Sequence, residues 1–255
     1  MKQIPNIVTL LNLFCGCIAI LFTLQNGVAI ANDAETGTQL IVLTEKIWLA
    51  SLFIGIAAVV DFFDGFVARL MGASSEMGKQ LDSLADVVSF GVAPGMIMYQ
   101  LLRLGVARGE DGLDASIMWL MPAFILPCAA AYRLAKFNLD TRQTYSFRGT
   151  PVPSVGLTIA AFPLIYWYSN TDWVLGLLLN KWFIYTVIAI LSWLMVSDIP
   201  IMSNKFKEKT LQANLPKLLL LVIAVVAGVL LGWLSVPLIF TAFVLLSVIF
   251  KKTIQ

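Results

Sequence analysis

Long apolar stretches alternate with short polar segments along the whole chain. Each stretch is close to the ~20 residues that an α-helix needs to cross the hydrocarbon core of a bilayer. Helices are favoured because lipid cannot satisfy the backbone hydrogen-bonding groups of an open strand or loop. The pattern predicts an all-α, polytopic membrane helix bundle with about eight transmembrane helices. The predicted helices lie near 5–24, 47–70, 83–104, 117–137, 152–170, 181–198, 216–233 and 236–250.

The most polar connection is SNKFKEKTLQANLPK, residues 203–217, which carries four lysines. It separates a body of six predicted helices from a C-terminal pair. We therefore predict a core over 1–200, a cytoplasmic linker over 201–217 and a transmembrane hairpin over 218–255. The lysines fit the positive charge expected of a cytoplasmic loop, and they could also contact anionic lipid head groups. The sequence has no recognisable internal repeat, which disfavours an inverted-repeat transporter.

Composition supports an integral membrane protein, since 59% of the residues are hydrophobic and 13% are charged. A soluble domain has about 25% charged residues. The chain contains no histidine, which removes the usual acid–base group near neutral pH and the commonest metal ligand. Its three cysteines fall in apolar stretches, and we interpret them as small hydrophobic residues. Catalysis would then depend on carboxylates, Lys, Tyr, Cys or a metal.

Basic residues are distributed unevenly across the predicted topology. Of the 17 Lys and Arg, only Lys46, Arg103, Arg108 and Lys181 fall on one side, and all the others share the side of the N-terminus. By the positive-inside rule, this second side is cytoplasmic. We predict a multi-pass protein of the bacterial cytoplasmic membrane, with both termini on the cytoplasmic side. The first helix resembles a secretory signal with a cleavage site near 29–31, but its apolar stretch is long, so we expect it to stay uncleaved.

Four aspartates interrupt the apolar pattern in the segment DFFDGFVARLMGASSEMGKQLDSLAD, residues 61–86. On the first helix of this segment, the period of 3.6 residues places Asp61 and Asp64 on one stripe. Two small residues share that stripe, Gly65 and Ala68. The stripe therefore combines carboxylates with room for a ligand to approach the backbone.

On the following helix, a spacing of four residues forms a second stripe from Gly78, Asp82 and Asp86. A short polar connection lets the two helices run antiparallel, so the four carboxylates should meet near the cytoplasmic surface. Carboxylates packed at that depth would take up protons unless cations neutralise them. Isolated intramembrane aspartates also serve ion pathways or helix packing, but four at this spacing favour a metal site.

Two divalent cations would balance four negative charges. Oxygen ligands without histidine point to Mg²⁺ or Mn²⁺ rather than zinc. A pair of such ions about 4 Å apart is common in displacement at phosphorus. Arg69 and Ser75, at the turn between the helices, could then reach phosphate oxygens.

Written as a pattern from Asp61 to Asp86, the segment reads D-x2-D-G-x2-A-R-x8-G-x3-D-x3-D. This pattern resembles the signature of the CDP-alcohol phosphatidyltransferase family at every specified position. The resemblance implies a catalytic core of six helices and two divalent cations. It also implies transfer of a phosphatidyl group from a CDP-linked lipid to an alcohol, with release of CMP.

The same resemblance implies roles for individual residues. The metal ligands would be Asp61, Asp64, Asp82 and Asp86, and Asp86 would also be the catalytic general base. The CDP-binding positions would be Asn6, Thr9, Gly65, Ala68, Arg69, Ser75 and Gly78. For the polar residues of the N-terminal PNIVT, helix capping is an alternative explanation.

Longer stretches extend the resemblance over roughly residues 4–160. They are IPNIVTLLNLFCG, SSEMGKQLDSLADVVSFGVAPG, YRLAKFN and FRGTPVPS. They are more similar to the serine-accepting, integral-membrane members of the family than to those that use glycerol phosphate or inositol phosphate. The resemblance thus implies CDP-diacylglycerol and L-serine as substrates and phosphatidylserine as product, with the other acceptors as alternatives.

A serine acceptor needs a cation for its carboxylate group. Candidate acceptor-binding residues are Arg133, Lys136 and Asn138, at the cytoplasmic end of the fourth predicted helix. Membrane anchoring by snorkelling side chains explains the two basic residues equally well. Arg142 and Arg148 follow closely, so counting basic residues does not exclude a phosphorylated acceptor.

Two other classes of membrane protein also use intramembrane aspartates. A divalent-cation transporter would usually place them on several helices or in repeated halves. An intramembrane prenyltransferase also holds Mg²⁺-diphosphate, but the interposed Gly65, Ala68, Arg69 and Gly78 argue against it. Bundles of this kind often dimerise, so a homodimer is compatible with the sequence, and no nucleic-acid partner is expected.

Overall fold

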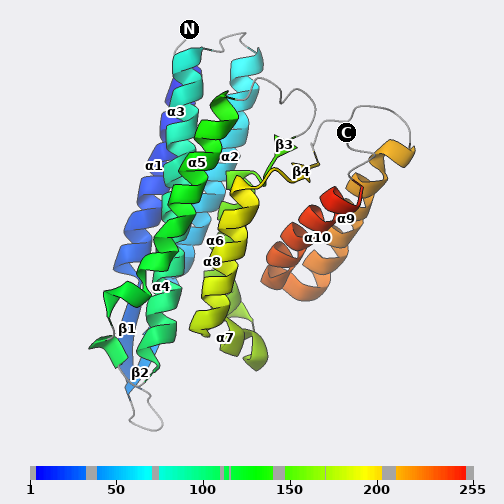
Figure 1. Ribbon diagram of the computed structural model, residues 1–255. Coiled ribbons are helices and arrows are strands. Elements are labelled where there is room, and N and C mark those ends of the chain that lie inside the picture. The colour runs from blue at the N-terminus through cyan, green and yellow to red at the C-terminus, as the bar shows by residue number, and fades with distance from the viewer. Residues whose placement is uncertain are drawn as a thin grey trace.

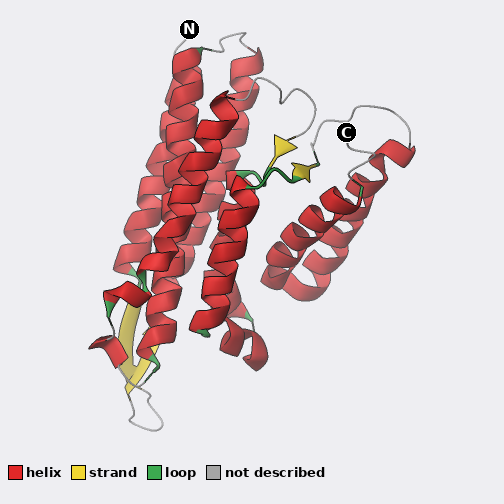
Figure 2. Ribbon diagram, in the orientation of Figure 1, coloured by secondary structure: helices red, strands yellow, loops and turns green. Residues whose placement is uncertain are grey.

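The fold is a bundle of long helices with a smaller helical hairpin beside it, as the computed structural model shows (Figure 1). The structure describes residues 4–32, 39–70, 75–109, 112–114, 116–139, 147–169, 171–202 and 211–250. Helices make up most of this described part, with only short strands at the edges of the bundle (Figure 2). The all-α prediction is therefore confirmed.

Two helices open the chain, α1 (Ile4–Gln25) and α2 (Trp48–Leu70), and they pack against each other. A small antiparallel hairpin joins them, made of β1 (Val28–Asn32) and β2 (Gln39–Leu43). This hairpin lies at the end of the bundle opposite to the N-terminus (Figure 1). The start of α1 and the end of α2 consequently share one end of the bundle.

The next helical stretch, Glu76–Ala107, is 32 residues long. It consists of α3 (Glu76–Asp86), a π-helical segment (Val87–Val92) and α4 (Ala93–Ala107). Pro94 lies at the start of α4 and has no N–H to donate. The wider π-helical turns directly before it accommodate the missing hydrogen bond.

Hydropathy predicted that this helix begins near residue 83, and the structure begins it at 76. Ser75 is the reason, since its Oγ accepts a hydrogen bond from the N–H of Gly78 at 3.0 Å and caps the helix. The first turns of α3 are polar. A hydropathy pattern therefore misses them, although they carry part of the aspartate stripe.

The predicted helix over 117–137 is also shifted. Two short 3-10 segments, Ile117–Trp119 and Met121–Phe124, come first, and α5 covers only Ile125–Leu139. Pro122 lies at the start of the second segment, where a residue without an N–H is tolerated. The body is completed by three helices, α6 (Val152–Tyr168), α7 (Asp172–Leu178) and α8 (Lys181–Val196).

Small residues let several elements close on the π-helical segment. A Cβ added at Gly16 of α1 would lie 2.8 Å from Ser89 Cα, and one at Gly156 of α6 would lie 3.0 Å from Phe90 Cα. The first distance is too short for a real Cβ, and the second is tighter than most real Cβ contacts, so glycine permits both close approaches. The residues that follow Asp86 are thus held between α1 and α6.

The ends of α5 and α8 are connected by a second strand pair. β3 (Phe147–Arg148) pairs antiparallel with β4 (Pro200–Ile201). Directly after β4, the N–H of Met202 donates to Ser247 Oγ at 3.1 Å, which attaches the body to the C-terminal helices. Those helices, α9 (Leu211–Leu231) and α10 (Ser235–Ile249), run side by side as a hairpin (Figure 1).

Within the described residues, four helical stretches are long and apolar enough to cross a membrane: Pro5–Gln25, Glu45–Val67, Glu76–Ala107 and Asn214–Ile249. The pair α7 and α8, bent by 69°, would be a fifth if both helices belong to one span. The protein is an integral membrane protein, and these stretches agree with most of the predicted helices. The count of eight spans remains a prediction, because α5 and α6 are shorter than a full span.

Candidate active site

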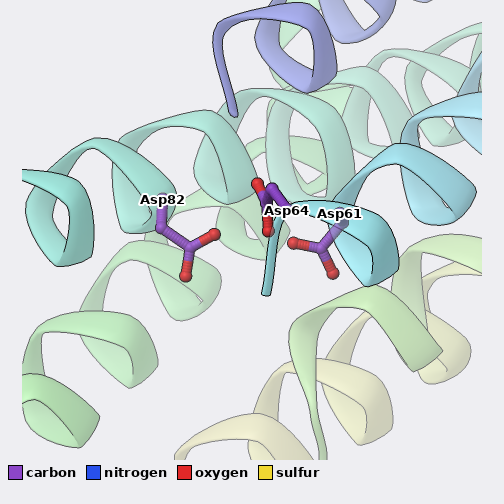
Figure 3. A group of neighbouring side chains, drawn as sticks. All are labelled: Asp61, Asp64 and Asp82. Carbon is purple, nitrogen blue, oxygen red and sulfur yellow. The ribbon is translucent and has the colours of Figure 1, made fainter. Parts of the chain in front are cut away.

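Three carboxylates from two neighbouring helices meet in the bundle. Asp61 and Asp64 extend from α2, and Asp82 extends from α3 (Figure 3). One oxygen from each lies within 4.8 Å of the others. Asp82 of the second stripe therefore meets Asp61 and Asp64 of the first, as the spacing of the aspartates predicted.

The environment of these carboxylates fits a hard cation. Asp64 is buried, and its Oδ2 has no hydrogen-bond partner among the described residues. An unpaired buried carboxylate oxygen is unfavourable, and two more carboxylates nearby add repulsion. Divalent cations with oxygen ligands would relieve both effects. The described part of the chain thus contains a three-aspartate cluster that could bind metal, with a ligand set suited to Mg²⁺ or Mn²⁺.

Asp86 lies one helical turn beyond Asp82 and is buried beside this cluster. Its carboxyl group is within hydrogen-bonding reach of Asp61. The Nδ2 of Asn12 on α1 donates to Asp86 Oδ1 at 3.4 Å. The four aspartates therefore come together as a tight group of three with a fourth next to it.

A polar cavity of about 490 Å³ opens next to the cluster. It is formed by the first turns of α1, the end of α2 and the start of α3. Its lining residues are Pro5, Asn6, Thr9, Asp64, Gly65, Ser75, Glu76, Gly78, Lys79 and Asp82. Five of the predicted CDP-binding residues thus line one cavity, and two of the aspartates form part of its wall.

Gly78 has a spatial reason to be glycine. A Cβ at this position would lie 3.1 Å from Asn6 Oδ1 and 3.2 Å from Ser75 Oγ, so a larger residue would crowd the cavity wall. Thr9 lies within hydrogen-bonding reach of Asp64, which links the cavity to the aspartate cluster. The remaining two predicted CDP-binding residues, Ala68 and Arg69, have side chains outside the described part of the structure.

The predicted acceptor-binding residues have different surroundings. Arg133 is buried, its guanidinium lies over the ring of Phe137 at 5.2 Å, and its charge interacts with that of Asp86. Its Nε has no partner among the described residues. Lys136 pairs with Asp198 at 2.9 Å. Among the three candidates, Arg133 is the one whose surroundings connect it to the aspartates.

Asn138 connects α5 to α3. Its Nδ2 donates to Ser83 Oγ at 2.8 Å, and its main-chain oxygen accepts from Lys79 Nζ at 3.1 Å. These contacts fix the end of α5 beside the aspartate helix. Arg148 is exposed in β3, and Arg142 lies outside the described residues.

Sequence reasoning missed two residues of this region, Asn12 and Lys79. Asn12 follows Asn6 and Thr9 at intervals of three residues, so a polar stripe on an otherwise apolar first helix was the available signal. Lys79 directly follows Gly78 of the signature and lines the cavity. No sequence pattern separates it from an ordinary solvated lysine.

A second and larger cavity, of about 620 Å³, lies between the body and the C-terminal hairpin. Its lining comes from α6, α7, α8, α9 and α10 and contains no ionisable residue. The two threonines in the lining, Thr158 and Thr241, donate to carbonyl oxygens of their own helices at 2.8 Å. This cavity offers no group for acid–base or metal chemistry.

Comparison with known proteins agrees with the pattern of the aspartate segment. A model of the CDP-alcohol phosphatidyltransferase family matches residues 2–201. The CDP-diacylglycerol–serine O-phosphatidyltransferase of Bacillus subtilis (strain 168) is 31% identical over 172 residues, which are 65% of this chain and 78% of that protein. The protein of the same name from Methanocaldococcus jannaschii is 31% identical over 197 residues, 77% of this chain and 72% of that one.

Two other relatives are more distant. The CDP-diacylglycerol–serine O-phosphatidyltransferase of Mycobacterium leprae (strain TN) is 28% identical over 207 residues, 78% of this chain. The match covers only 58% of that longer protein. The archaetidylserine synthase of Methanothermobacter thermautotrophicus is 27% identical over 169 residues, 66% of this chain and 60% of that protein.

Proposed function

Since the chain belongs to the CDP-alcohol phosphatidyltransferase family, we propose that it transfers the phosphatidyl group of CDP-diacylglycerol to the hydroxyl group of L-serine. The products are phosphatidylserine and CMP. The observation that supports this chemistry most directly is the cluster of Asp61, Asp64 and Asp82 beside a polar cavity. The choice of serine is supported by the names of the relatives in Bacillus and Methanocaldococcus.

In this proposal, the aspartate cluster with Asp86 beside it holds two divalent cations, Mg²⁺ or Mn²⁺. Such ions neutralise the carboxylates and polarise phosphoryl oxygens. The cavity next to the cluster holds the CDP group of the donor, with Asn6, Thr9 and Ser75 as polar contacts. The N-terminal end of α3 faces this cavity and favours a negatively charged phosphate.

Asp86 is the proposed general base. Its carboxylate takes the proton of the serine hydroxyl, the oxygen attacks the phosphorus on the lipid side, and the bond to the CMP oxygen breaks. Serine hydroxyl is a weak nucleophile, so a positioned base contributes about 10²–10⁴-fold in rate. Asp86 suits the task because it is buried next to the cluster and is not one of the three closest carboxylates.

Arg133 is the proposed partner of the serine carboxylate. Its guanidinium is buried near Asp86 with an unpaired Nε, and a buried cation needs a partner. A carboxylate bound there would bring the serine hydroxyl toward the proposed base. Lys136 and Asn138 contribute indirectly in this proposal, since they hold α5 through Asp198 and Ser83.

Asp61 and Asp64 belong to the C-terminal half of α2, and Asp82 belongs to α3. The end of α2 and the start of α3 lie at the end of the bundle that carries the N-terminus (Figure 1). We propose that this end faces the cytoplasm, because the predicted topology assigns most of the basic residues to the side of the N-terminus. Serine would arrive from the cytoplasm, and the acyl chains of the donor would stay in lipid. We also propose a catalytic core over 1–200, a cytoplasmic linker over 201–217 and a separate hairpin over 218–255.

The test is an acceptor comparison with purified protein, CDP-diacylglycerol and Mg²⁺ or Mn²⁺. Serine, glycerol 3-phosphate and inositol phosphate are offered separately, and both CMP and the lipid product are measured. We expect CMP release and phosphatidylserine with serine only. CMP release with a phosphorylated alcohol but not with serine would support phosphatidyl transfer and contradict serine as the acceptor. No CMP release with any alcohol would contradict the proposed reaction.

A further inference from the structure

Asp86 receives a hydrogen bond from a residue of the first helix, Asn12. Asn12 is fully buried in α1, and its Nδ2 lies 3.4 Å from Asp86 Oδ1. The two residues are 74 positions apart in the chain, so this contact depends on the tertiary fold. We propose that Asn12 is a positioning residue that orients the Asp86 carboxylate for proton transfer, an inference that rests on the proposed function.

An amide is well suited to this task. It donates an N–H to one carboxylate oxygen and leaves the other oxygen available for the incoming proton. A cationic side chain would form an ion pair with the base and weaken it as a proton acceptor. Another carboxylic acid would add charge to a cluster that already contains several carboxylates. The neutral donor therefore fixes the direction of the base without changing the charge of the site.

Asn12 is itself held in place. The Oγ of Ser89, in the π-helical segment after Asp86, donates to the main-chain oxygen of Asn12 at 3.0 Å. One turn further along α1, Gly16 lets the helix backbone come close to the same Ser89. Donor and acceptor of the Asn12–Asp86 contact thus lie on two segments that are locked together. A fixed geometry of this kind is what a positioned base requires.

Packing alone does not explain an amide at this position. The Oδ1 of Asn12 is buried without a hydrogen-bond partner among the described residues. A buried unpaired acceptor is unfavourable, and a leucine of similar size would avoid it. The unpaired Oδ1 therefore lowers the stability of the fold. The contact between the Asn12 amide and Asp86 gives a reason for an asparagine at this position.

The experiment measures kcat and KM for serine and for CDP-diacylglycerol in the wild-type protein, Asn12→Leu and Asn12→Asp. Leucine removes the donor, and aspartate keeps the shape but replaces the donor with an acceptor. We expect kcat to fall about 10- to 100-fold in both variants, because a misdirected base loses part of its effect. Both KM values should stay within about threefold, since the substrates bind elsewhere.

Ser89→Ala is the matched control. It removes a buried hydrogen bond between the same two segments and leaves the Asn12 amide next to Asp86. We expect a lower melting temperature and a much smaller fall in kcat than in Asn12→Leu, because the amide that contacts Asp86 is still present. If Ser89→Ala and Asn12→Leu lower kcat equally, Asn12 only packs the helices together and the inference is overturned.

The outcomes separate this inference from the proposed function. Wild-type protein without serine-dependent CMP release would contradict the proposed function itself. Active wild-type protein together with a full kcat in Asn12→Asp would overturn the role of Asn12 alone. If Asn12→Leu does not fold, Asn12→Asp decides the question, because it keeps the volume of the side chain.

Discussion

Asp64 illustrates how the surroundings of one residue restrict the chemistry of the site. One of its carboxylate oxygens is buried without a partner among the described residues, and two more carboxylates lie within 4.8 Å. In isolation such a group would take up a proton to avoid the cost of burial. A divalent cation removes that cost and keeps the carboxylates ionised. The same residue also forms part of the cavity wall, so a bound phosphate would meet the cations there.

Asp86→Asn tests the general base directly. The amide keeps the size of the side chain but cannot accept the serine proton, so kcat should fall about 10²- to 10⁴-fold. KM for CDP-diacylglycerol should change little, because Asp86 is not among the residues that line the proposed CDP cavity. Steady-state CMP release checks both values.

Asp114→Asn is the control for this change. Asp114 is exposed in a short 3-10 segment after α4, and the same loss of charge there should leave kcat unchanged. A fully active Asp86→Asn protein would rule out Asp86 as the base.

Arg133→Ala tests acceptor binding. Removing the buried cation should raise KM for serine at least about tenfold, since a charge-assisted hydrogen bond is lost. KM for CDP-diacylglycerol should stay near its wild-type value. Arg108→Ala, an exposed arginine at the end of α4, is the matched control. An equal rise of both KM values in Arg133→Ala would indicate general damage to the site and contradict a role in serine recognition.

At the scale of elements, α1 lies close to the π-helical segment at Gly16. In Gly16→Ala the new Cβ would lie 2.8 Å from Ser89 Cα. The backbone would have to shift to remove this overlap, which should lower the free energy of unfolding by about 1–3 kcal/mol. Gly55→Ala on α2 is the control, because a Cβ there meets nothing within 4 Å. Thermal unfolding in detergent should show a lower melting temperature for Gly16→Ala only. Equal melting temperatures would mean that α1 can shift without cost.

Most of the element order could be predicted from hydropathy, because a lipid-spanning helix needs a long apolar stretch. Two helix starts were predicted wrongly, and both errors have local causes. α3 begins at Glu76, inside a polar segment, because Ser75 caps it. The helix expected from 117 begins as α5 only at Ile125, after a segment with Pro122. Caps and prolines act over a few residues and leave the average hydropathy unchanged.

For the site, the sequence predicted the stripes and their meeting, since helix periodicity fixes which residues share a face. It did not reveal that three carboxylates form the tight group and that Asp86 lies beside them. It also missed Asn12, because the contact with Asp86 joins residues 74 positions apart. Such contacts depend on how α1 packs against α3, which no local pattern specifies.

At the scale of the whole molecule, the described site residues belong to the first five helices, and the C-terminal hairpin lies beside the body (Figure 1). We expect a chain that ends at residue 202 to keep kcat within about tenfold of wild type, because it retains the cluster and its cavity. Its melting temperature should be lower, since α10 packs against α6 and Ser247 binds the backbone of Met202. CMP release and thermal unfolding check the two expectations. A folded but inactive truncated chain would show that the hairpin belongs to the catalytic unit.

In this proposal, a membrane helix bundle carries a polar cavity beside the aspartate cluster, where the two proposed substrates would meet. The proposed reaction has little covalent chemistry for the protein to perform, so charge compensation and positioning carry most of the catalysis. In the proposed mechanism, both would depend on cations held by the aspartates of α2 and α3. Metal occupancy of the aspartate cluster is therefore the central claim.

The most direct measurement is Mn²⁺ binding to the purified protein by electron paramagnetic resonance, together with CMP release after removal of divalent ions. We predict two Mn²⁺ bound per wild-type chain, loss of activity on chelation and recovery on adding Mn²⁺ or Mg²⁺. Asp64→Asn should lose both binding and activity, and Asp114→Asn should keep both. Wild-type protein that binds no Mn²⁺, or that releases CMP in excess chelator, would contradict the account.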